Sequence, residues 1–193
     1  MTQDFSNIET PRLTLRRFRA QDKPAFTAYR NDPGVARYQS WEAFTEEEAN
    51  ALIQGMETLP FGLPGQGLQI AVEERSSGGL IGDCYLQVEA HDTRQAEIGF
   101  TLSSRHQGKG FASEALLALL SDAFVRLDLH RIAAVTDSRN SPAAALLERL
   151  GFRREGHFLQ NIWFKGAWGD EYLYAVLREE WLVANSVSHQ CDA

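Results

Sequence analysis

The stretch Arg105-His-Gln-Gly-Lys-Gly-Phe-Ala112 lies between an extended run at 94–103 and an apolar helical pattern at 110–127. Gly108 and Gly110 remove two side chains from this turn, so the backbone can approach a ligand closely. The first amides of the following helix lack intrahelical partners and lie at the positive end of its dipole, where they suit a phosphate. The pattern therefore predicts an anion-binding loop, with an ordinary strand-to-helix turn as the alternative.

Two common nucleotide-binding motifs do not fit this loop. A P-loop requires Ser or Thr after Gly-Lys, whereas Gly110 follows Lys109. A dinucleotide fingerprint requires a third glycine or alanine where this chain has Ser113. If the loop binds phosphate, it does so as part of a different motif.

A second strand and helix follow at 130–152. His130-Arg-Ile-Ala-Ala-Val-Thr136 is a short apolar run that predicts a strand, and Ala143 to Leu150 predicts a helix. Between them, Ser141 fits the N-cap and Pro142 the first helical position, and Gly151 fits the C-terminal stop.

The remaining segments complete one α/β domain. Strands are predicted at 12–18, 68–74, 80–88 and 168–181, helices at 22–30 and 45–58, and a turn at Asn31-Asp-Pro-Gly34. A chain of 193 residues is long enough for one well-buried core. We expect a single domain over 9–181, with flexible termini at 1–8 and 182–193.

Three segments in this order resemble the GNAT family of N-acetyltransferases. They are the loop that follows "Glu-Ile-Gly-Phe" (97–100), the run "Asn-Ser-Pro-Ala…Leu-Leu-Glu-Arg-Leu-Gly-Phe" (140–152), and the closing segment 168–181. The opening Glu9-Thr-Pro-Arg-Leu-Thr-Leu-Arg16 is similar to the branch of ribosomal-protein N-terminal acetyltransferases. The resemblance implies the acyl-CoA N-acyltransferase (GNAT) fold, an α/β fold with a mixed central sheet flanked by helices. Its two central strands splay apart, and acetyl-CoA, the cosubstrate, lies between them.

The resemblance also implies which residues bind acetyl-CoA. They are Phe100, Thr101 and Leu102 on the splayed strand, Arg105, Gln107, Gly108, Lys109, Gly110, Phe111, Ala112 and Ser113 in the loop and helix start, and Asn140. Leu102 aligns with the position whose backbone N–H meets the thioester oxygen. As alternatives, Lys109 is a solvated side chain, Asn140 is a turn residue, and 100–102 is plain core strand.

For catalysis, Glu97 matches the family position of a glutamate near the acceptor amine. A carboxylate in a mostly apolar strand can have the raised pKa that a base needs; a structural glutamate is the alternative. The general acid is less clear, because 142–152 contains no tyrosine and Ala143 stands where part of the branch has a serine. Tyr172 and Tyr174 are the candidates for the general acid in place of the missing residue, and core packing is the alternative role for both.

The acceptor is expected to be an amine, either a protein N-terminus or a small molecule. The fold implies a pocket formed by the early helices, the 59–67 loop and a hairpin near 158–170. Four aromatic residues could line it, with core packing as the alternative: Trp41, Phe61, Trp163 and Trp168.

Composition narrows the classes of protein. The formal net charge of −7 argues against a nucleic-acid surface and modestly favours a cationic substrate. No apolar run suits a membrane helix and no signal peptide is evident, so no membrane association and a cytoplasmic location are expected. The five histidines lack metal spacing, and Cys84 and Cys191 are predicted to be free thiols. A non-catalytic acyl-CoA-binding regulator and a plain interaction domain remain as alternatives, and a homodimer is left open.

Overall fold

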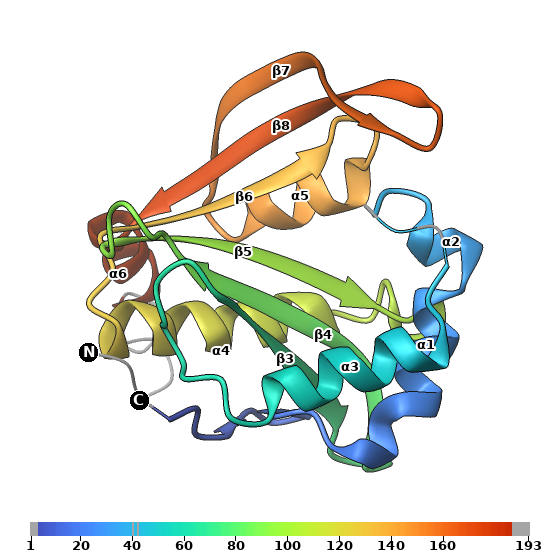
Figure 1. Ribbon diagram of the computed structural model, residues 1–193. Coiled ribbons are helices and arrows are strands. Elements are labelled where there is room, and N and C mark those ends of the chain that lie inside the picture. Colours follow the sequence, from blue (N-terminus) through green and yellow to red (C-terminus); the bar gives the residue numbers. More distant parts are fainter. Residues whose placement is uncertain (1–3, 40, 42, 187–193) are drawn as a thin grey trace.

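In a computed structural model that describes residues 4–39, 41 and 43–186, the chain forms a mixed eight-stranded sheet with helices on both faces (Figure 1). The strands are β1 (Ile8–Glu9), β2 (Leu13–Arg16), β3 (Gly67–Glu74), β4 (Gly79–Val88), β5 (Gln95–Leu102), β6 (Arg131–Asp137), β7 (Arg153–Phe164) and β8 (Ala167–Leu177). Their order in the sheet is β1-β2-β3-β4-β5-β6-β8-β7. Only β5 and β6 pair in parallel, and the other neighbours among these strands are antiparallel.

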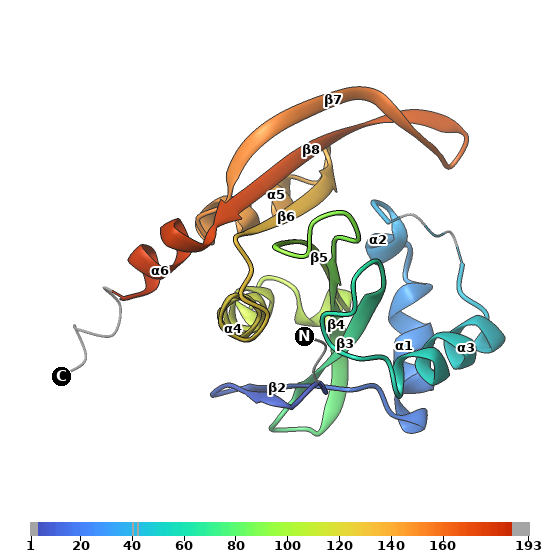
Figure 2. The ribbon, with the colours of Figure 1, turned by 60° about the vertical axis from the view of Figure 1, so that its left-hand side comes forward.

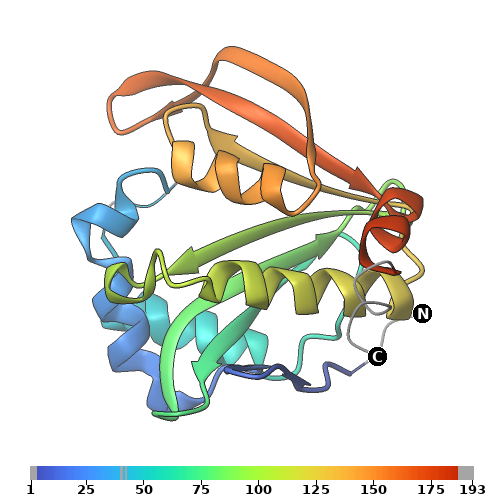
Figure 3. The same ribbon diagram turned by 180° about the vertical axis from the view of Figure 1, so that it is seen from behind.

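The helices enclose the sheet from two sides. They are α1 (Lys23–Arg30), α2 (Pro33–Ala36), α3 (Glu46–Met56), α4 (Phe111–Arg126), α5 (Ser141–Arg149) and α6 (Arg178–Ser186). Figure 2 looks nearly along α4 and shows β3 and β4 between α4 and the pair α1 and α3. From behind, α4 crosses the face of β3 to β5, and α5 covers β6 and β8 (Figure 3).

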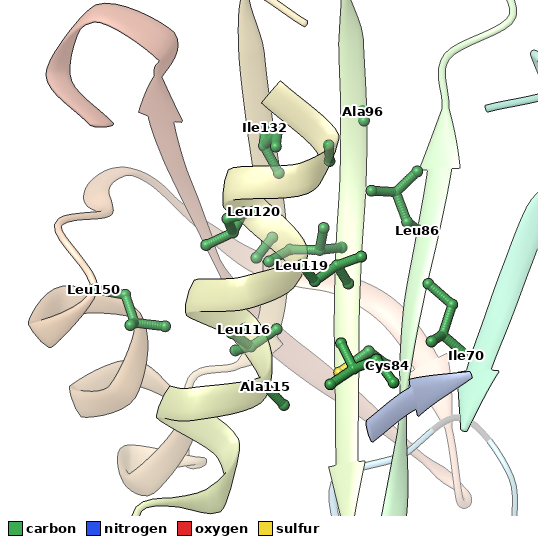
Figure 4. Close-up of a cluster of buried hydrophobic side chains, with 14 of the residues drawn as sticks. Ile70, Cys84, Leu86, Ala96, Ala115, Leu116, Leu119, Leu120, Ile132 and Leu150 are labelled. Carbon is green, nitrogen blue, oxygen red and sulfur yellow. The ribbon is translucent and has the colours of Figure 1, made fainter. Parts of the chain in front are cut away.

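The main core lies between α4 and the sheet (Figure 4). Leu116, Leu119 and Leu120 of α4 have no exposed surface and pack among Leu86 of β4 and Ile132 of β6. Each buried leucine contributes roughly 1.5–3 kcal/mol relative to an exposed one, which holds α4 firmly against the strands. The start of α4 is therefore fixed relative to the end of β5.

The parallel strands β5 and β6 separate after three paired positions. Gln95, Ala96 and Glu97 pair with Arg131, Ile132 and Ala133. Beyond them β5 continues to Leu102 and β6 to Asp137 without pairing to each other, and the ribbons diverge in Figures 1 and 3. This opening confirms the predicted splay of the two central strands.

Four local predictions need correction. Asn140, not Ser141, is the N-cap of α5, so Ser141 and Pro142 are its first two residues. Residues 31–34 do not form a free-standing turn, because the Asp32 side chain accepts a hydrogen bond from Gly34 N and caps α2. The last strand ends at Leu177 and α6 follows, so regular structure extends past 181 to Ser186. At the N-terminal end, the side chain of Phe5 is buried and Ile8 begins β1, although the segment 1–8 is predicted to be flexible.

Candidate active site

A cleft of about 650 Å³ lies at the open ends of β5 and β6. Four parts of the chain line it: Gly34, Val35, Tyr38 and Gln39 in and after α2; Phe100, Thr101 and Leu102 of β5; His106, Gln107, Gly108, Gly110, Phe111, Ala112 and Ser113 in the loop and α4; and Asn140, Pro142, Ala143, Ala145, Leu146 and Arg149 at α5. Ten of the twelve residues predicted to bind acetyl-CoA are among them. The side chains of Arg105 and Lys109 are exposed, and neither residue lines this cleft.

The loop at the start of α4 presents its backbone to the cleft. Gly108 and Gly110 have φ angles of +71° and +81°, which side-chain-bearing residues rarely adopt. Gly110 is the N-cap of α4, and its carbonyl accepts the first helical hydrogen bond, from Glu114 N. The amides of residues 111–113 therefore have no intrahelical acceptor, and all three residues line the cleft. This geometry suits an anion.

The end of β5 offers backbone groups on its unpaired edge. Ser103 N donates to Ile81 O on β4 at 2.9 Å. Because successive residues of a strand turn their N–H and C=O groups to opposite edges, Leu102 and Phe100 turn theirs away from β4, toward the opening. The Leu102 carbonyl accepts a hydrogen bond from the Gln107 side chain at 3.0 Å. Thr101, by contrast, turns its backbone toward β4.

Asn140 caps α5 and also lines the cleft. Its Oδ1 accepts a hydrogen bond from Ala143 N at 3.3 Å and caps α5. Within the part of the chain that the structure describes, its Nδ2 group has no hydrogen-bond partner. The amide thus caps the helix and still has donors for a ligand in the cleft.

Sequence reasoning missed Arg149, a cation on the α5 wall of the cleft. Among the described residues it makes no hydrogen bond or ion pair. It lies within the quoted run 140–152, but the run does not tell which way this exposed side chain points. We expect Arg149→Gln to raise the KM for acetyl-CoA about threefold to fivefold, since an exposed charge interaction is worth up to about 1 kcal/mol.

A matched control for this prediction is Lys109→Gln, which removes an exposed cation that lies outside the cleft lining. Initial rates at varied acetyl-CoA should change less for this variant than for Arg149→Gln. The difference in KM for acetyl-CoA between Arg149→Gln and the parent should become smaller as the salt concentration is raised, because salt screens exposed charges. A larger effect at Lys109 would show that Lys109, and not Arg149, is the cation that contributes to acetyl-CoA binding.

Glu97 lies at the base of the opening between β5 and β6. It occupies the last position paired with β6. Its neighbours Ala96 and Ile98 are buried in the core beneath α4, so the alternating Glu97 side chain lies on the opposite face of the sheet. Burial raises the pKa of Glu97, and the nearby carboxylates Glu89 and Glu171 raise it further.

Tyr172 lies on the other face of the sheet from Glu97. Glu97 pairs with Ala133 and Ala133 with Ala175, so Glu97 shares a face with Ala175, Leu173 and Glu171. The alternating Tyr172 and Tyr174 therefore face the α5 side, where the Tyr174 hydroxyl donates to Glu148 at 2.9 Å. The Tyr172 ring packs against His157 and the Arg154 guanidinium and does not line the cleft.

The aromatic residues predicted for an acceptor pocket are dispersed. Phe61 is fully buried against Phe5, which corrects its predicted place in a groove. Its ring centre also lies 5.2 Å from the guanidinium of Arg126 at the C-terminal end of α4, and Phe61 does not line the cleft. Trp163 and Trp168 are 59% and 57% exposed and pack edge-to-face on the β7–β8 hairpin. Trp41 is half-buried and donates from its indole nitrogen to Arg30 O at 3.0 Å.

In the described ranges, no group of three His, Cys, Asp or Glu side chains is arranged to hold a metal ion. No helix in the part of the chain that the structure describes is long and apolar enough to cross a membrane. Cys84 is a buried free thiol whose pKa is raised by burial. Cys191 lies outside the described residues.

Splayed parallel strands beside a glycine-containing loop and a helix N-terminus are the features that the resemblance to the GNAT family implies for an acyl-CoA site. The family model described as an acetyltransferase (GNAT) domain matches residues 12–153, and the chain belongs to this family. It is an acetyl-CoA-dependent N-acetyltransferase, and the alternative of a non-catalytic regulator is not supported.

Named relatives and solved structures agree with this assignment. The uncharacterized N-acetyltransferase p20 of Bacillus licheniformis is 34% identical over 92% of this chain and 99% of its own length. The ribosomal protein uS5-alanine N-acetyltransferase of Escherichia coli is 33% identical over 44% of this chain and 43% of its own length, in line with the predicted branch. A GNAT-family acetyltransferase from Bacillus anthracis superposes with a TM-score of 0.80 at 31% identity, covering 90% of this chain and 99% of its own. Spermidine N-acetyltransferase from Vibrio cholerae, solved with CoA and spermine, superposes with a TM-score of 0.77 at 25% identity. The match covers 90% of this chain and 99% of that structure's chain.

Proposed function

We propose that this N-acetyltransferase moves the acetyl group of acetyl-CoA directly to a primary amine, and that the α-amine of a protein N-terminus is the acceptor. The opening of β5 from β6 beyond Glu97 carries this proposal. It leaves unpaired backbone groups of β5 between the anion-binding loop and a carboxylate with a raised pKa. The branch resemblance and the uS5-alanine N-acetyltransferase relative support the choice of acceptor.

In the proposed binding mode, the phosphates of acetyl-CoA bind the amides at 108–113. Arg149 adds charge from the α5 wall, and the Asn140 amide donates to the pantetheine arm. The N–H of Leu102 donates to the thioester oxygen. A hydrogen bond to that oxygen stabilises the negative charge that develops as an amine attacks.

The proposed chemistry uses Glu97 as the general base. An ammonium ion cannot attack a thioester, so Glu97 takes one proton from the amine, directly or through one water. The amine nitrogen then bonds to the acetyl carbon and gives its second proton to water, the carbon–sulfur bond breaks, and the CoA thiolate takes a proton from water. Tyr172 is not needed for this last step, because a thiolate is a good leaving group.

Glu89 and Glu171 favour a second acceptor class, polyamines. Both carboxylates lie close enough to Glu97 to raise its pKa, and they would attract an acceptor with several positive charges. The structural likeness to spermidine N-acetyltransferase also supports polyamines as this second acceptor class.

One assay decides between the two acceptors. CoA-thiol release from acetyl-CoA would be followed with short peptides with free Ser, Ala or Met N-termini, and with spermidine and spermine. Turnover of peptides with little turnover of polyamines is expected. The reverse ranking would overturn the peptide assignment, and absence of turnover with every amine would overturn Glu97 as the general base for acceptors of both classes.

A further inference from the structure

The anion-binding loop is braced by Arg12, which lies about a hundred positions away in the sequence. Its Nη1 donates to the carbonyl of Lys109 at 3.0 Å, between the two glycines with positive φ. In the described part of the chain, no other hydrogen bond from outside 102–114 reaches the backbone of 107–110. The Arg12 guanidinium also lies 4.5 Å from the centre of the Phe111 ring, which lines the cleft.

The same arginine neutralises an acidic residue at the start of α4. Arg12 Nε donates to Glu114 Oε2 at 2.6 Å, and its backbone N–H donates to Glu114 Oε1 at 2.8 Å. The Thr10 hydroxyl donates to the same Oε1 at 2.6 Å. Burial opposes ionisation of Glu114, but these hydrogen bonds outweigh it and lower its pKa, so the carboxylate is charged at neutral pH. A carboxylate without this partner, in the same first turn of α4 as the amides of 111–113, would repel a phosphate.

We propose that Arg12 is a positioning residue for acetyl-CoA: it fixes the Lys109 carbonyl, and with it the orientation of the Gly110–Ser113 amides, and compensates the charge of Glu114. This inference rests on the proposed binding of the cofactor phosphates at 108–113. Arg12 itself does not line the cleft, so it acts through the loop. Its planar fork reaches the carbonyl and the carboxylate together, which a lysine ammonium cannot reproduce.

Calorimetric titration of CoA into the purified full-length protein tests the proposal. Arg12→Ala is expected to weaken CoA binding about tenfold, with kcat at saturating acetyl-CoA within about twofold of the parent, because the reacting groups are untouched. The CoA affinity of Arg12→Lys should lie between that of the parent and that of Arg12→Ala. The matched control is Arg75→Ala: Arg75 is equally exposed and donates to Thr10 O at 2.8 Å, but has no contact with the loop. Its CoA affinity should stay within twofold of the parent.

The double variant Arg12→Ala/Glu114→Gln separates positioning from charge. It removes the unpaired carboxylate but leaves the Lys109 carbonyl without its donor, so CoA binding should recover only in part. Full recovery would overturn the positioning role, as would unchanged affinity in Arg12→Ala or equal losses in the Arg75→Ala control. If Arg12→Ala does not fold, the comparison of Arg12→Lys with Arg75→Ala decides. Failure of the parent to bind CoA would instead overturn the proposed cofactor site.

Discussion

Glu97→Gln is expected to lower kcat at pH 7 by about 10²- to 10³-fold, within the range that a positioned general base contributes. CoA affinity should stay within about twofold, because Glu97 lies at the base of the opening and does not line the cleft. Steady-state rates with the best acceptor, together with calorimetry of CoA, measure both quantities. A kcat within threefold of the parent would exclude Glu97 as the base.

The pH dependence follows from the direction of the Glu97 pKa shift. Burial and the charges of Glu89 and Glu171 raise this pKa, and the deprotonated carboxylate is the active form, so the rate should rise with pH through the raised pKa. Glu89→Gln removes one of the repelling charges and should move this rise to lower pH while keeping turnover. Glu97→Gln should abolish the rise.

Stability gives an independent check on Glu97. A carboxyl whose pKa is higher in the folded than in the unfolded chain costs stability as pH rises from its unfolded value through its folded value. The neutral glutamine removes this cost, so Glu97→Gln should be at least as stable as the parent at pH 7 in urea unfolding. A structural glutamate would instead make the variant less stable, and that result would favour the alternative interpretation of this residue.

The sequence predicted the elements whose causes are local. Gly108 and Gly110 indicate a turn in which the backbone can adopt positive φ angles. The separation of β5 from β6 follows from the resemblance of three ordered motifs to the family. Choices between adjacent residues were harder: Asn140 and Ser141 both suit an N-cap, and only the backbone path of the turn decides that Asn140 caps α5. Phe61 illustrates the same limit, because nothing in a Pro-Gly-rich loop tells whether its aromatic ring faces solvent or the core.

Contacts between distant segments could not be predicted at all. The Arg12 brace joins residues about a hundred positions apart, and one sequence contains no signal for that pairing. Tyr38, which follows α2, lines the cleft, and no local pattern in the sequence indicates that it lies there. The sequence likewise does not predict Arg149 at the cleft, because the direction of its side chain depends on how α5 packs on the sheet.

Gly82→Ala is expected to destabilise the protein by about 3 kcal/mol, because it forces extra volume into a tightly packed place. Gly82 pairs with Leu102, where β5 lines the cleft. A Cβ at Gly82 would lie 2.2 Å from the Thr101 carbonyl oxygen and 2.9 Å from the Leu102 Cα. These are backbone atoms that cannot rotate away, so the end of β5 must move from β4. In a chain of this size the loss corresponds to a fall in Tm of roughly 6–12 °C.

The displacement should reach the cofactor as well, because the Leu102 N–H is the group proposed to meet the thioester oxygen. Gly82→Ala is therefore expected to lower kcat and Tm together, measured by steady-state rates and by thermal unfolding without ligand. Gly99→Ala is the matched control for stability: it lies on β5, where its Cβ would meet nothing closer than Tyr85 Cβ at 3.6 Å. It should stay within about 1 kcal/mol of the parent, as a substitution without a clash does. Equal unfolding midpoints for the two variants would mean that β5 is not held by β4 at its open end, and the thioester position inferred from Leu102 would lose its structural basis.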